Sequence, residues 1–130
     1  MAPITTLYAA LLALLFIVLA GVVVRGRLRH KIHLGTGSRG EIEQQVRAHA
    51  NLAEYAPVFL ILLLLAELGG AAAWLLHAAG ATFVIARVLH GTGLNSARGE
   101  SFGRYWGTVL TWLLIVALAV HLLVRSIAAI

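Results

Sequence analysis

Cysteine is absent from this chain of 130 residues, and charged residues make up only 12% of it. Without cysteine there are no disulfides, no thiolate metal sites and no cysteine nucleophile, so any thiol chemistry needs a thiol carried by a substrate. Hydrophobic residues make up 61% of the chain, and the mean hydropathy is +0.93. This composition is too apolar for a soluble domain of this size. It predicts an integral membrane protein, and the length predicts one membrane domain over residues 1–130.

Acidic residues are also scarce, with five Asp and Glu against ten Lys and Arg. Half of the basic residues lie in one short stretch after the first apolar segment: Arg25, Arg27, Arg29, Lys31 and Arg39. Basic residues beside an apolar segment follow the positive-inside rule, so this pattern predicts membrane topology and no nucleic-acid partner. Residues 1–6 carry no basic side chain, and we therefore expect the first apolar segment to be a transmembrane helix that is not cleaved as a signal peptide.

Charges and glycines divide the hydrophobic sequence into four predicted transmembrane helices, at about 3–24, 41–68, 71–93 and 102–126. The predicted fold class is an all-α, integral membrane four-helix bundle. Gly69 and Gly70 predict a short turn that makes the second and third helices an antiparallel hairpin. The first and third loops are the basic ones, which predicts that both are cytoplasmic and that both termini lie outside.

Polar side chains gather in the second predicted helix, directly before its hydrophobic run. Arg47, Asn51, Glu54 and Tyr55 stand at i, i+4, i+7 and i+8, so they share one helix face. A carboxylate at membrane depth is unfavourable unless it is paired, so Glu54 is a candidate functional residue. Pro57 follows within one turn and predicts a kink beside Glu54.

Further polar residues belong to the same end of the predicted bundle. Arg87 and His90 lie near the end of the third helix, and Arg104 lies at the start of the fourth. Several guanidinium groups with one carboxylate suit a small anionic ligand that also carries an amine. In the alternative interpretation the same charges only neutralise one another between helices.

Three segments of the chain resemble the MAPEG family, the membrane-associated proteins in eicosanoid and glutathione metabolism. Residues 47–57 resemble its helix-two signature, with the sequence RAHANLAEYAP. Residues 86–94 are similar to the end of helix three in bacterial members, with the sequence ARVLHGTGL. Residues 104–108 resemble the start of helix four, with the sequence RYWGT. The resemblance covers nearly the whole chain.

This resemblance implies a homotrimer in the bacterial inner membrane that binds glutathione between subunits, near the cytoplasmic face. It implies a glutathione transferase that acts on lipophilic electrophiles or reduces lipid hydroperoxides, with contacts to membrane lipid and no metal. Arg104 is the implied catalytic residue, because a nearby guanidinium favours the reactive thiolate. The implied glutathione-binding residues are Arg47, Asn51, Glu54, Tyr55, Arg87, His49, His90, Arg27 and Arg98.

Several alternatives remain open at this point. Arg98 is a second candidate for the thiolate-stabilising arginine, and His90 stands where eukaryotic members often have tyrosine, which leaves the electrophile undefined. A non-catalytic lipid-binding or scaffold member is a second function class. A small proton-coupled exporter that uses Glu54 is a third.

Three titratable residues lie toward the opposite end of the predicted bundle. We expect Glu67 to be an ordinary interfacial charge beside the helix turn. His77 and His121 have no paired-ligand spacing, so we expect interfacial or hydrogen-bonded histidines, not haem ligands.

Overall fold

Four long α-helices make up the computed structural model, which describes the backbone of residues 1–96 and 102–130 and the side chains of residues 1–92 and 102–130. The helices are α1 (Pro3–Arg29), α2 (Gly40–Leu68), α3 (Ala73–Ser96) and α4 (Phe102–Ala129). Each contains a stretch that is long and apolar enough to cross a membrane. The predicted all-α membrane four-helix class is confirmed.

Some helix ends differ from the predicted ones. The first helix continues from residue 24 to Arg29, because arginine favours helix and only Gly26 weakens the extension. The first charged residue marks the end of the apolar segment, but the helix itself can continue beyond it. The second helix runs without interruption through Pro57, whose missing N–H removes one backbone hydrogen bond.

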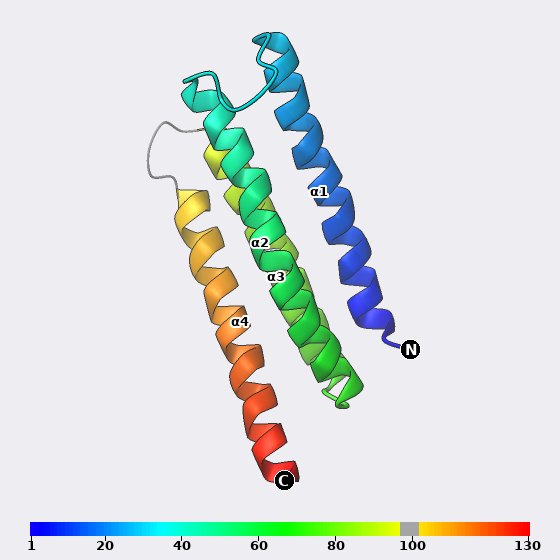
Figure 1. The fold of residues 1–130 in the computed structure, drawn as a ribbon. Coiled ribbons are helices and arrows are strands. Elements are labelled where there is room, and N and C mark those ends of the chain that lie inside the picture. Colours follow the sequence, from blue (N-terminus) through cyan, green and yellow to red (C-terminus); the bar gives the residue numbers. More distant parts are fainter. Residues whose placement is uncertain (97–101) are drawn as a thin grey trace.

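The helices run alternately up and down, and α2 and α3 form the centre of the arrangement (Figure 1). The first helix packs on α2 and α3, and α4 packs on the same two helices from another side. Within the described residues, α1 and α4 do not contact each other. This order brings the start of α2, the end of α3 and the start of α4 to one end of the bundle.

The predicted turn between α2 and α3 is a Schellman motif. Gly70 has a φ of +78°, a left-handed conformation that glycine adopts without a steric penalty. The N–H of Ala71 donates to the carbonyl of Ala66 at 3.0 Å, and the N–H of Gly70 donates to the carbonyl of Glu67 at 3.0 Å. These two bonds satisfy carbonyls at the end of α2 and direct the chain back along the bundle.

Glu67 is a helix cap, so the expectation of an ordinary interfacial charge is wrong. Its carboxylate accepts hydrogen bonds from the N–H of Ile4 at 2.9 Å and from the N–H and hydroxyl of Thr5 at 2.7 Å and 2.6 Å. The first N–H groups of a helix have no partner within it and carry partial positive charge. The end of α2 thus supplies the acceptor that the start of α1 lacks in its own sequence.

The centre of the bundle is apolar, and one of its buried contacts joins α2 to α3. Phe59 and Phe83 are fully buried and stack with their ring centroids 3.9 Å apart. His77 contacts Tyr8 on α1, whose hydroxyl lies 3.1 Å from Nδ1 of His77. The expectation of a hydrogen-bonded histidine is therefore confirmed for His77.

Candidate functional site

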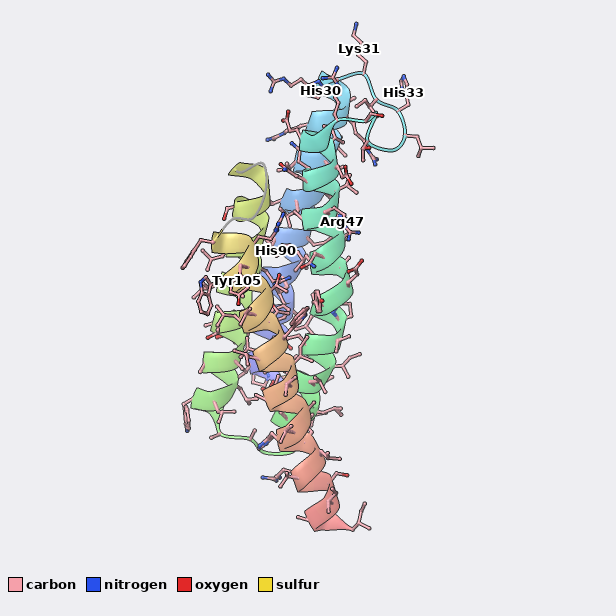
Figure 2. The ribbon with its side chains drawn as sticks, turned by 90° about the vertical axis from the view of Figure 1, so that its left-hand side faces the viewer. His30, Lys31, His33, Arg47, His90 and Tyr105 are labelled. Atoms are coloured by element: carbon pink, nitrogen blue, oxygen red, sulfur yellow. The ribbon has the colours of Figure 1, made fainter. Side chains whose placement is uncertain are left out.

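A polar cavity of about 270 Å³ lies where α2, α3 and α4 meet near one end of the bundle. Its lining residues are Arg47, Asn51, Glu54, His90 and Arg104. Figure 2 shows Arg47 on α2 and His90 on α3 at neighbouring levels of the bundle, below the loop that carries Lys31. Five of the predicted site residues are thus brought together from three helices.

Helical spacing explains the contribution of α2. Arg47, Asn51 and Glu54 lie on successive turns of one face. Arg47 and Glu54 are exposed in the single chain, whereas Asn51 is half-buried. The wall formed by α2 therefore presents a guanidinium, an amide and a carboxylate, with the amide closest to the protein interior.

Arg87 lies behind this wall and does not line the cavity. It is 2% exposed, and its Nη2 donates to the carbonyl oxygen of Gly107 at 2.6 Å. Its Nη1 donates to Oδ1 of Asn51. The guanidinium carbon also lies 5.6 Å from the ring centroid of Tyr55 and 5.7 Å from that of Phe83, within cation–π range. Arg87 thus connects α2, α3 and α4 directly beneath the site.

Tyr55 turns its hydroxyl toward α4 and does not line the cavity. The indole Nε1–H of Trp112 donates to this hydroxyl at 2.9 Å. Sequence reasoning missed this pair. An indole N–H needs an acceptor when it is removed from water, and that requirement is the one signal the sequence offers.

Gly107 allows α3 and α4 to approach closely beside the cavity. A Cβ atom at this position would lie 2.6 Å from the carbonyl oxygen of Ala86 and 2.9 Å from Cβ of His90. Ordinary side chains do not fit into such a space, so the contact requires glycine. The same residue supplies the carbonyl that holds Arg87. Sequence reasoning missed this role, although a glycine within a helix signals close packing.

Comparison with known proteins identifies the family. The family model of the MAPEG family matches residues 5–124. The chain belongs to the MAPEG family. It is also 34% identical over 92 residues to "Inner membrane protein YecN" of Escherichia coli strain K12, an alignment that covers 71% of this chain and 70% of that protein. The protein of the same name from Escherichia coli O6:H1 gives the same values. Together with the four apolar helices, these matches show a multi-pass membrane protein of the MAPEG family.

Two more predicted site residues of this MAPEG protein, His49 and Arg27, do not line the cavity. The ring of His49 packs against Phe16 of α1, with the centroids 4.3 Å apart. Arg27 is half-buried near the end of α1 and does not line the cavity. Arg98 lies outside the described residues. Among the residues that the structure describes, no group of three or more His, Cys, Asp or Glu side chains is placed to hold a metal ion.

Proposed function

We propose that this MAPEG protein is a membrane-bound glutathione transferase whose activated thiolate also reduces lipid hydroperoxides. The observation that carries the proposal is the set of charges around the cavity. Arg47 and Arg104 supply two guanidinium groups, and Glu54 supplies one carboxylate. Glutathione carries carboxylates, an ammonium group and a thiol that reacts as its thiolate, so Arg47 suits a carboxylate, Glu54 suits the ammonium group and Arg104 is left for the thiolate. Arginine is well suited to carboxylate recognition because its planar fork donates two parallel hydrogen bonds.

Arg104 is the proposed thiolate-stabilising residue. A thiol of this type has an ordinary pKa of about 8.5, so at neutral pH only a few per cent is the nucleophilic thiolate. A guanidinium beside the sulfur favours the charged form and increases that fraction. Arg104 lies in the first turn of α4, where the helix N-terminus also favours negative charge.

A lipophilic second substrate would arrive through the bilayer, while glutathione would enter from water. The cavity lies near the end of the bundle that carries the basic α1–α2 loop, and the helix surfaces below it expose large apolar side chains. We place this end on the cytoplasmic side of the bacterial inner membrane, with both termini outside. Glutathione is then available from the cytoplasm.

We propose a homotrimer in which a neighbouring subunit completes the site. The cavity of about 270 Å³ is at the lower edge of the range of roughly 300–1,000 Å³ that is usual for small-molecule sites. Arg47 and Glu54 are also exposed on the single chain. A second copy that packs against this face would enclose the ligand and strengthen its contacts with both charges.

The test is conjugation of glutathione to 1-chloro-2,4-dinitrobenzene by the purified protein in proteoliposomes. Arg104→Ala should reduce kcat by about 100-fold, with little change in glutathione binding, because electrostatic stabilisation of a developing charge is worth about that much. Arg47→Ala and Glu54→Ala should instead weaken binding. Arg29→Ala is the matched control, since Arg29 is exposed at the end of α1 and does not line the cavity.

The outcomes separate the candidate functions. Full turnover by Arg104→Ala would remove Arg104 from the mechanism. No turnover by the wild-type protein above the uncatalysed reaction would favour a non-catalytic lipid-binding or scaffold member. Transport driven by a pH gradient would favour an exporter, although two arginines in the cavity are unfavourable for a cationic cargo.

A further inference from the structure

The orientation of the Asn51 side chain can be determined from its contact with Arg87. Arginine has only donors, so the atom of Asn51 that faces the guanidinium must be its carbonyl oxygen Oδ1. Arg87 itself is 2% exposed and does not line the cavity, whereas Asn51 does. The amide nitrogen Nδ2 is the other branch of the same planar group. Because Oδ1 is used by Arg87, Nδ2 is the polar atom of the Asn51 side chain that remains available to the cavity.

Arg87 is well suited to hold this orientation because several contacts fix its own position. Nη2 donates to the carbonyl oxygen of Gly107 at 2.6 Å, and Nη1 donates to Asn51. The rings of Tyr55 and Phe83 contact the guanidinium on two helices. The Gly107 carbonyl is in turn held by the Thr111 hydroxyl at 2.8 Å. A rigid donor on one side of Asn51 leaves its amide little freedom to rotate.

We propose that Arg87 is a positioning residue that fixes Asn51 so that its Nδ2 donors face the ligand in the cavity and bind a carboxylate. The identity of that carboxylate, as one of the two in glutathione, rests on the proposed function. With this orientation Arg47, Arg104 and Asn51 all present donors, and Glu54 presents the carboxylate acceptor. The cavity thereby selects a ligand with more carboxylate than ammonium groups. Arg87 acts on the ligand only through Asn51.

Asn51→Asp separates the two roles of the side chain. A carboxylate of nearly the same shape still accepts from Arg87, so the contact that joins α2 to α3 is kept as an ion pair. The atom that faces the cavity changes from a donor to an acceptor and now repels a ligand carboxylate. The thermal unfolding midpoint should stay near that of the wild type, whereas the Kd for glutathione should rise about 10-fold to 100-fold. Gln44→Glu is the matched control, because it makes the same amide-to-carboxylate change two turns earlier on α2, outside the cavity lining.

The selectivity readout uses glutathione and its diethyl ester, which lacks both free carboxylates. Calorimetry in dodecyl maltoside would give the Kd of each ligand for each variant. The preference for the free acid should fall about tenfold in Asn51→Asp relative to the wild type, and should be unchanged in Gln44→Glu. A role of Asn51 in stability alone would leave this preference unchanged.

Two substitutions of Arg87 test its part. Arg87→Met removes the donor that orients Asn51 and should reduce the preference for the free acid, although residue 87 does not line the cavity. Arg87→Lys keeps one donor for Asn51 and should therefore retain more of that preference than Arg87→Met. It also serves as the folded variant if Arg87→Met does not fold. The proposed role of Arg87 and Asn51 would be overturned if Asn51→Asp bound glutathione with the wild-type Kd and kept the wild-type preference for the free acid. The same result in both Arg87→Lys and Arg87→Met would also overturn it. Absence of glutathione binding by the wild-type protein would overturn the proposed function as well.

Discussion

The close approach of α3 and α4 at Gly107 makes a specific prediction for Gly107→Ala. The added Cβ would lie 2.6 Å from the Ala86 carbonyl oxygen and 2.9 Å from Cβ of His90. These two atoms and the His90 nitrogen at 3.0 Å are all backbone or Cβ atoms, which no side-chain rotation can move. The helices must therefore separate by several tenths of an ångström, and overpacking of this kind costs about 1–3 kcal/mol.

Gly21→Ala is the matched control for this substitution. Gly21 also lies inside a helix, but nothing lies within 4 Å of the Cβ it would gain. Alanine is favoured over glycine in a helix interior by about 0.5–1 kcal/mol, and both variants receive this gain. We expect Gly21→Ala to be neutral or slightly stabilising and Gly107→Ala to be about 1–3 kcal/mol less stable than Gly21→Ala, because only overpacking distinguishes them.

The assay is equilibrium unfolding in mixed micelles of dodecyl maltoside and sodium dodecyl sulfate, followed by circular dichroism, with glutathione affinity measured on the same samples. Separation of α3 from α4 also shifts the Gly107 carbonyl away from Arg87, so affinity should fall together with stability. Equal stability of Gly107→Ala and Gly21→Ala would refute the close packing of α3 on α4 and the account of how the site is held.

Three further substitutions probe two contacts that join helices. Glu67→Ala removes the acceptor of three hydrogen bonds at the start of α1 and should reduce the free energy of unfolding by about 1–2 kcal/mol. Glutathione affinity should not change, since Glu67 lies 16 residues, or about 24 Å, along α2 from Asn51. The exposed Glu43 gives the control variant Glu43→Ala. Unchanged stability of Glu67→Ala, or a loss of stability equal to that of Glu43→Ala, would contradict the role of Glu67 as a cap. Trp112→Phe and Tyr55→Phe each break the same hydrogen bond and should each reduce stability by about 0.5–1.5 kcal/mol in the unfolding assay. The double variant should lose less than the sum of the two, and strict additivity would show that the pair does not interact.

Periodicity and charge predicted the elements and part of the site. Four apolar segments of sufficient length predict four membrane helices, because an isolated membrane helix satisfies its own backbone hydrogen bonds. The spacing of Arg47, Asn51 and Glu54 places them on one face of α2, and the structure has all three in the lining of one cavity. His90 and Arg104 join them because consecutive antiparallel helices return the chain to the same end of the bundle.

Contacts across helices could not be predicted in the same way. The pairing of Arg87 with the Gly107 carbonyl depends on the vertical register and rotation of α3 against α4, and neither is encoded by the period of one helix. The sequence interpretation of Glu67 used only its position beside a turn. Its actual role is to accept hydrogen bonds from the start of α1, where Thr5 lies 62 residues earlier in the chain. Family resemblance placed Arg87 among the ligand-binding residues, but resemblance does not distinguish a residue that lines a cavity from one that lies behind the lining.

The most direct test of the central claim is the ultraviolet absorbance of the purified protein in detergent, titrated with glutathione at neutral pH. A thiolate absorbs near the far-ultraviolet edge and a thiol does not, so the titration reports binding and activation together. We expect a saturable thiolate band in the wild-type protein that is lost in Arg104→Ala, while calorimetry still detects binding. A wild-type protein that binds glutathione without the band, or that does not bind it at all, would contradict thiolate activation at this cavity.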